Sequence, residues 1–201
     1  MKAKKVLALV LCAALLVAGS VAATLAYLTF TTGVVTNTFT TGNVAITLDE
    51  SVADVYGVKG NGTTTTGNEY KLIPGHKYTK DPTVHVQAGS EDCYLFVKVV
   101  NGISNIEAAG DTTIAAQMAA KGWTAVANTN GVYAYNAKVS AGANVEVFAS
   151  FTVAGNAVLT NADGSAKYSA NTPITVQAYA VQADNFGNAA AAWTAAPCTA
   201  W

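Results

Sequence analysis

The chain has 201 residues, of which 51% are hydrophobic and 11% charged, and its formal net charge is −1. All eleven basic residues are Lys, and three of them lie within the first five positions, so the remainder carries eight Lys against twelve acidic residues. A mildly acidic body without Arg lacks the clustered cations that bind phosphates. The composition therefore excludes nucleic acid as a partner.

The N-terminus has the pattern of a secretory signal peptide. A basic start at residues 1–5 precedes an uncharged apolar run at residues 6–18, and small residues follow. This order of charge, apolar run and small residues is typical of an exported precursor. We expect cleavage between Ala26 and Tyr27, with the position after Ala23 as the other candidate.

The same apolar stretch is also long enough for an uncleaved membrane anchor. Residues 6–28 make 23 residues, and about 20 apolar residues span a bilayer. Gly19, Ser20 and Thr24 interrupt the stretch, and no charged residue flanks its end. We therefore expect cleavage, contact with the membrane only before cleavage, and a secreted mature chain of residues 27–201.

The body of the chain is predicted to form a single all-β domain. Apolar and polar residues alternate with period two in several segments, as they do in half-buried strands. These segments lie at 44–49, 83–87, 93–100, 145–153 and 174–180. The segment 93–100 is apolar on both faces, which favours a central strand. The Gly- and Thr-rich stretch 60–68 is expected to be an exposed loop.

Two short helices are expected between or after the strands. Thr112 or Thr113 can cap a helix that ends at Gly122, and Asn188 can cap a second helix that ends before Pro197. Several short antiparallel strands with one or two short helices predict an antiparallel β-sandwich with a jelly-roll-like topology.

Two cysteines remain once the signal peptide is removed. Cys93 and Cys198 would be exported to a compartment in which a disulfide can persist. The alternative is that Cys93 is a small buried hydrophobic residue and Cys198 a free thiol in the C-terminal tail. The sequence leaves both interpretations open.

No pattern of catalytic, cofactor-binding or metal-binding residues is found. His76 and His85 lack the spacing of a His-Glu-x-x-His pair, and no residue is placed to be the third ligand of a zinc site. No Gly-x-Ser-x-Gly motif is present for a nucleophile. The acidic pairs at 49–50 and 91–92 would point to opposite faces of a strand. The sequence therefore predicts a protein that is not an enzyme and that needs no cofactor or metal.

Several blocks of the sequence resemble the TasA/camelysin family of Gram-positive bacteria. The apolar leader runs into residues 26–29, and the pattern Phe-x-x-Gly-x-Val-x-Ile-x-Leu follows at residues 39–48. Further similar blocks lie at 72–75, 78–84, 90–99 and 174–183. The resemblance implies a jelly-roll sandwich, removal of the signal peptide by a SipW-type signal peptidase, and a structural subunit of biofilm-matrix or cell-surface fibres.

The resemblance also implies assembly by donor-strand addition. The freed N-terminal segment of one subunit would complete the sheet of the next, and this head-to-tail contact would build a homopolymer or a filament with related matrix proteins. Residues 27–39 suit this role, because they lack charge and Pro and extend about 43 Å. The apolar side chains expected to enter the neighbouring subunit are those of Leu28, Phe30, Val34, Val35 and Phe39.

Two other functions of the protein and one other arrangement of residues 27–39 remain open. Camelysin-like relatives are described as surface metalloproteases, although this chain has no recognisable zinc motif. A monomeric surface adhesin would instead bind its ligand through loops such as 60–68. The segment 27–39 could also fold back as an edge strand of its own domain, because strand pairing does not depend on which chain provides the strand.

Overall fold

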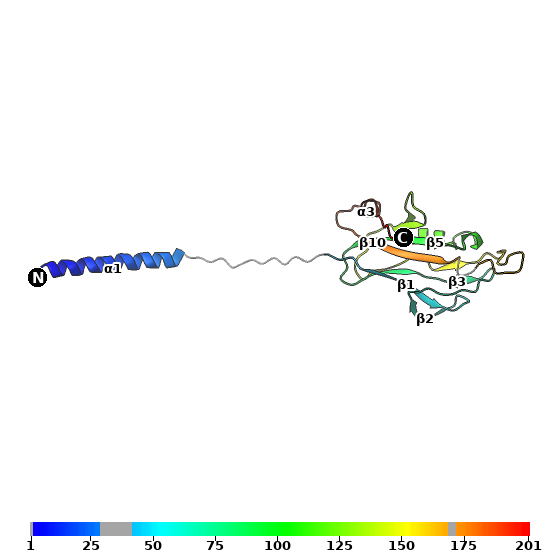
Figure 1. Cartoon of the computed structure of the whole chain (residues 1–201), viewed down its shortest axis with the longest axis horizontal. Helices are drawn as coiled ribbons and strands as arrows, with labels where there is room; N and C mark the ends of the chain where they lie inside the picture. The colour runs from blue at the N-terminus through cyan, green and yellow to red at the C-terminus, as the bar shows by residue number, and fades with distance from the viewer. Residues whose placement is uncertain (1, 29–41, 169–171) are drawn as a thin grey trace. The chain divides into compact units, whose positions relative to one another are not determined.

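The structure is a computed structural model that describes residues 2–28, 42–168 and 172–201 (Figure 1). It divides into two units, residues 1–40 and residues 41–201. In the first unit, helix α1 spans Lys2–Leu28, a stretch rich in the strong helix formers Ala and Leu. Among the helices that the structure describes, none is long and apolar enough to cross a membrane.

In the second unit, residues 42–168 and 172–201 form three antiparallel sheets, with four, four and two strands. The first sheet has the order β2 (Lys59–Thr64), β1 (Ile46–Ala53), β4 (Thr83–Val86) and β8 (Asn144–Glu146). The second has the order β10 (Ile174–Gln182), β5 (Cys93–Asn101), β7 (Val132–Tyr135) and β6 (Trp123–Ala125). The third pairs β3 (Lys77–Thr79) with β9 (Ser150–Thr152). The prediction of a predominantly antiparallel β fold is confirmed.

The small third sheet continues the ladder between β4 and β8. Tyr78 pairs with Phe151, and Val84 pairs with Val145, in the same register on both sides of the interruption. Pro82 lies at the interruption and has no N–H to donate to a ladder. β3 and β4 are therefore two parts of one long strand, and β8 and β9 are its interrupted partner.

This interruption corrects the inward row predicted over residues 145–153. Val147 and Phe151 are buried as expected, but Ala149 is exposed and its neighbour Phe148 is fully buried. Val145 and Val147 before the break, and Phe151 and Val153 after it, are all buried, so the alternation keeps its phase and is lost only at residues 147–149, which are not in regular strand geometry. The predicted inward row is therefore confirmed on both sides of the break and wrong only at Ala149.

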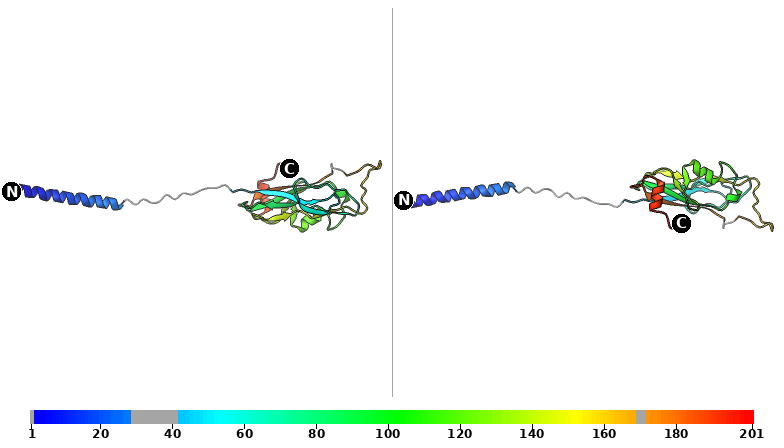
Figure 2. Two further views of the ribbon diagram at one scale, coloured as in Figure 1. Left: turned by 90° about the horizontal axis from the view of Figure 1, so that it is seen from below. Right: turned by 90° about the horizontal axis from the view of Figure 1, so that it is seen from above.

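Strand β5 is an inner strand, as predicted, and its two faces contact different cores. Leu95 and Val97 are fully buried in a core to which strands of all three sheets contribute. Tyr94 and Phe96 lie on the other face, in a smaller core beneath helix α3. Figure 2 shows the β unit from two opposite sides. The cyan strands β1 and β2 lie in front in the left view, and the red helix α3 lies in front in the right view.

Both predicted helices are present. Helix α2 spans Ile114–Ala120 and α3 spans Ala189–Ala195, and a short 3-10 helix, η1, spans Ser104–Ile106. The side chains of Thr113 and Asn188 each accept a hydrogen bond from a backbone N–H in the first turn of the following helix. These caps satisfy donors that have no partner inside the helix.

The Gly- and Thr-rich segment 60–68 differs from the prediction of a loop. Its first half belongs to β2, which pairs with β1. The side chains of β2 are mostly exposed, and Gly62 has a φ of 86°, a conformation that glycine adopts readily. A strand at the edge of a sheet needs only its backbone groups to pair, so a segment without apolar side chains can still extend the sheet.

Candidate functional site at the open edge of strand β10

Strand β10 forms an edge of the second sheet along its whole length. It pairs with β5 from Ile174–Asn101 to Gln182–Cys93 in nine consecutive residue pairs. Within residues 42–168 and 172–201, no other strand pairs with it. Figure 1 shows β10 as the long orange strand beside β5.

The hydrogen bonds at the two ends of this ladder show which backbone groups face the open edge. The N–H of Gly102 donates to the carbonyl of Pro173 at 3.0 Å, and the N–H of Ala183 donates to the carbonyl of Asp92 at 2.8 Å. Hydrogen-bonded and non-hydrogen-bonded pairs alternate in an antiparallel ladder, so residues 175, 177, 179 and 181 bond to β5. The N–H and C=O groups that point away from β5 are those of Ile174, Val176, Ala178, Ala180 and Gln182.

Two cavities border the start of β10, and the smaller of them lies between β10 and β1. The larger has a volume of about 440 Å³, and its lining includes Tyr70 and Phe151. The smaller has a volume of about 200 Å³, and its lining includes Glu50. Lys80 and Ile174 line both cavities. The first residues of β10 therefore border open space that Lys80 also lines.

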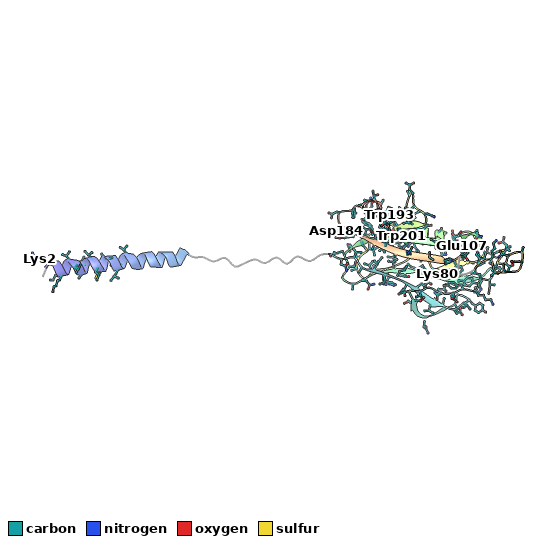
Figure 3. The ribbon with its side chains drawn as sticks, in the orientation of Figure 1. Lys2, Lys80, Glu107, Asp184, Trp193 and Trp201 are labelled. Carbon is teal, nitrogen blue, oxygen red and sulfur yellow. The ribbon has the colours of Figure 1, made fainter. Side chains whose placement is uncertain are left out.

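A buried polar cluster lies beneath the cavities. Glu50 and Lys80 are only 5% and 7% exposed, and their side chains form an ion pair with an Nζ–Oε2 distance of 2.7 Å. The Nδ2 group of Asn68 donates to Glu50 Oε1 and to the Ser51 carbonyl, both at 2.9 Å. The N–H of Ala53 donates to Asn68 Oδ1 at 2.8 Å. Figure 3 shows Lys80 within the β unit.

Asp81 holds β1 at the position where its pairing changes from β4 to β2. The backbone N–H and the hydroxyl of Ser51 donate to the two carboxylate oxygens of Asp81 at 2.8 and 2.7 Å, and Lys59 Nζ lies 3.1 Å from Oδ2. Burial raises the pKa of Asp81, but the bonds from Ser51 and the charge of Lys59 outweigh burial and lower that pKa. Asp81 therefore stays ionised.

Aromatic rings border the cluster. Tyr70 lies edge-on to Tyr78 and to Phe151, and the rings of Tyr78 and Phe151 are stacked with a centroid distance of 4.8 Å. Burial raises the pKa of the Tyr70 hydroxyl, and the charge of Glu50 raises it further. The hydroxyl therefore remains protonated, and it donates to the Thr79 carbonyl at 2.7 Å. The ion pair lies in a region of low polarity.

The outer face of the first sheet carries His85, as the alternation of its strand predicts. Its Nε2 lies 2.9 Å from Asp49 Oδ1 and its Nδ1 lies 2.7 Å from Asn144 Oδ1. The hydrogen bond with Asp49 raises the pKa of His85, and the bond with Asn144 raises it further. Across the described ranges, no group of three or more His, Cys, Asp and Glu residues could hold a metal ion.

Only part of the predicted N-terminal site falls within the described residues. Ala26 and Tyr27, the predicted cleavage site, lie in the last turn of α1, and Leu28 is the last residue of that helix. The other predicted donor-strand residues lie outside the described residues, namely Phe30, Val34, Val35 and Phe39. Cleavage and strand donation therefore stay predictions.

The disulfide considered from the sequence is absent, because Cys93 and Cys198 are both free thiols. Cys93 is fully buried in the core between the sheets, whereas Ala196 and Trp201, on either side of Cys198, pack in the core on the other face of the same sheet. Figure 3 shows Trp201 close to Trp193 of α3. Burial, helped by the charge of Asp92, raises the pKa of the Cys93 thiol to about 11, which leaves it unreactive.

The cluster of Glu50, Lys80 and Asn68 was not identified from the sequence. Its members are separated by 18 and 30 residues along the chain. One signal was available: Glu50 continues the inward phase of Ile46 and Leu48, and an acidic residue on an inward face needs a buried partner. The sequence around Lys80 and Asn68 gives no sign that either residue is a partner of Glu50.

The site thus combines an outward-facing backbone edge, two cavities and a buried ion pair. No protein-family model, curated protein or solved structure matches this chain.

Proposed function

We propose that the protein is a secreted structural subunit of a bacterial extracellular-matrix or cell-surface fibre, and that it assembles by strand addition. After removal of the signal peptide, residues 27–39 of one subunit would pair with the edge of β10 in the next. The observation that supports this proposal most is the edge of β10, which directs the backbone groups of alternate residues outward along nine residues.

The residues of β10 favour pairing with a further strand. Exposed edge strands are usually protected by charges, Pro, bulges or short length. The sequence of β10 contains neither a charged residue nor Pro. The other outer strands differ, because β2 begins with Lys59 and contains Gly, β8 contains Glu146, and β6 has only three residues.

The donor segment matches this edge in length and chemistry. Residues 27–39 are uncharged and extend about 43 Å, whereas the nine residues of β10 extend about 30 Å. A donor strand at this position would extend the second sheet and pass beside the smaller cavity, whose lining includes Ile174 and Val176. In this proposal the two four-stranded sheets form a jelly-roll sandwich whose open side is closed by the next subunit.

The contact would be heterologous, since the donor and the acceptor are different surfaces of the same chain. Heterologous contacts that do not close into a ring build filaments. Folding back of residues 27–39 onto β10 of the same subunit would form the same hydrogen bonds without assembly. The two arrangements differ in their dependence on protein concentration.

Electron microscopy and sedimentation of the mature chain, compared with a variant lacking residues 27–39, test the proposal. We expect filaments from the mature chain above a critical concentration and monomers from the truncated variant. A mature chain that stays monomeric at high concentration would refute assembly by itself and favour the adhesin. Chelator-sensitive cleavage of casein by the same sample would favour the metalloprotease.

A further inference from the structure

The cluster beneath β10 has the components of an internal cross-linking reaction. We propose that the side chains of Lys80 and Asn68 join in an intramolecular amide bond, with Glu50 as the proton-transfer group. This covalent modification is independent of the proposed function, because it requires only one folded subunit.

The geometry brings the two reacting groups to the same carboxylate. Lys80 Nζ lies 2.7 Å from Glu50 Oε2, and Asn68 Nδ2 lies 2.9 Å from Glu50 Oε1. Glu50 therefore contacts the amine that would attack and the nitrogen that would leave. Lysine, a carboxamide and a carboxylate in this arrangement have all the atoms that amide exchange requires.

The neighbouring backbone fixes the orientation of the carboxamide. The N–H of Ala53 donates to Asn68 Oδ1 at 2.8 Å, and Asn68 Nδ2 also donates to the Ser51 carbonyl at 2.9 Å. A backbone N–H aimed at a carbonyl oxygen polarises the carbonyl and stabilises negative charge that develops on the oxygen. Asn68 is thus held with its carbon activated for attack.

The first step of the reaction is a proton transfer between two buried side chains. Separate ions are expensive to remove from water, and buried ionisable groups reduce this penalty when a proton passes between them. Lys80 and Glu50 are almost fully buried, and Lys80 lines the same cavity as the rings of Tyr70 and Phe151. Transfer of a proton along the 2.7 Å hydrogen bond to Glu50 leaves Lys80 as a neutral amine, which is the nucleophilic form.

The reaction balances without an oxidant, reductant or other reactant. The Nζ lone pair of Lys80 forms a bond to Asn68 Cγ, and the carbonyl electron pair moves to Oδ1, which the Ala53 N–H stabilises. Glu50 takes a proton from Nζ and delivers protons to Nδ2. The Cγ–Nδ2 bond then breaks, the carbonyl re-forms, and the nitrogen leaves as ammonium while Glu50 returns to the carboxylate.

The departing nitrogen has a route to solvent. Asn68 and Lys80 both line the cavity of about 440 Å³ beside β10. The product would close residues 68–80 into a covalent loop and tie the connection after β2 to the strand formed by β3 and β4. A bond at this position resists proteolysis and pulling forces that would separate these segments.

Mass spectrometry of the full mature protein tests the proposal. We expect an intact mass below the sequence mass by one ammonia. Trypsin cleaves after Lys, and amide formation protects Lys80 from cleavage. The digest should therefore contain a branched peptide that joins residues 60–71 to residues 78–98. A full sequence mass, or a mass loss with only linear peptides, would overturn the proposal.

Three variants separate the reaction from simple ion pairing. Lys59→Arg is the matched control, because Lys59 is an exposed ion-paired lysine nearby, and it should keep the full mass loss. Glu50→Gln keeps the size of the side chain but cannot accept the proton, so it should retain the sequence mass. Asn68→Asp should lose water in place of ammonia. Circular dichroism checks that each variant folds, and cross-linking in Glu50→Gln at the original extent would refute the role of Glu50.

Discussion

Substitution of Ala178 by proline tests whether β10 accepts a strand. The N–H of Ala178 points away from β5, so proline removes a donor at the open edge and leaves the β5 ladder hydrogen-bonded. Proline is tolerated in edge strands when its missing N–H faces solvent. The variant subunit should therefore still fold, whereas the pyrrolidine ring should block pairing with an incoming strand.

The size of the effect follows from the hydrogen bonds that the donor strand would lose. Proline removes the bond from residue 178, and its ring prevents the adjacent bond in the ladder. Two bonds with a net value of about 0.5–1.5 kcal/mol each make about 1–3 kcal/mol per subunit contact. Every 1.4 kcal/mol is about a tenfold change, so the critical concentration for assembly should rise about 5- to 150-fold.

Sedimentation of the polymer as a function of protein concentration measures this change. Ala125→Pro is the matched control: Ala125 is an exposed alanine whose N–H also points outward, but it lies on β6, at the opposite edge of the same sheet. We expect the control to assemble as the wild type does. Equal assembly by Ala178→Pro, with urea unfolding showing that both variants are folded, would refute β10 as the acceptor.

Three further predictions concern the stability of the subunit. Phe151→Ala removes a ring that is 1% exposed and stacked on Tyr78, and it should lower the free energy of unfolding in urea by about 3–5 kcal/mol; a loss below about 1 kcal/mol would contradict the packing described. Because folding raises the pKa of His85, its stabilising contribution is complete below the unfolded value of about 6.5 and is lost as the pH rises through the folded value. His85→Gln should therefore remove part of the decrease in stability measured by thermal unfolding above that pH, and an unchanged profile would argue against the contact with Asp49. Asn188→Ala removes the cap of α3 and should cost about 1 kcal/mol, whereas no change in urea unfolding would show that the cap contributes nothing.

Strands β5 and β10 and both helix caps could be predicted because their signals are local. Period-two alternation follows from the pleat of a strand, and Cys93–Asn101 has apolar residues on both faces because it is covered on both. Thr113 and Asn188 cap helices through bonds within one turn. These features need no knowledge of the rest of the chain.

Strand β2 and the exposure of Ala149 could not be predicted in this way. β2 is held by backbone hydrogen bonds to β1, which leave no apolar pattern in the sequence of Lys59–Thr64. The break at residues 147–149 lies opposite Pro82, whose carbonyl accepts a hydrogen bond from the N–H of Val147 and which lies more than 60 residues earlier in the chain. In both cases the partner strand determines the structure.

The Glu50 cluster was missed for a related reason. Glu50, Asn68 and Lys80 come from three separate segments, and only the fold brings them together. The sequence could show that Glu50 occupies an inward position, but the identity of its partners depends on the pairing of β1 with β2 and β4. The local sequence pattern does not specify which strands pair with β1.

Amide hydrogen exchange along β10 tests the central claim most directly. The measurement compares the variant lacking residues 27–39, alone and with a synthetic peptide of residues 27–39, by NMR. We predict that the peptide slows exchange at Val176, Ala178 and Ala180, whose N–H groups face the open edge, while Gln177 is already protected by β5. Protection that appears only on another strand, or no protection at saturating peptide, would contradict strand addition at β10.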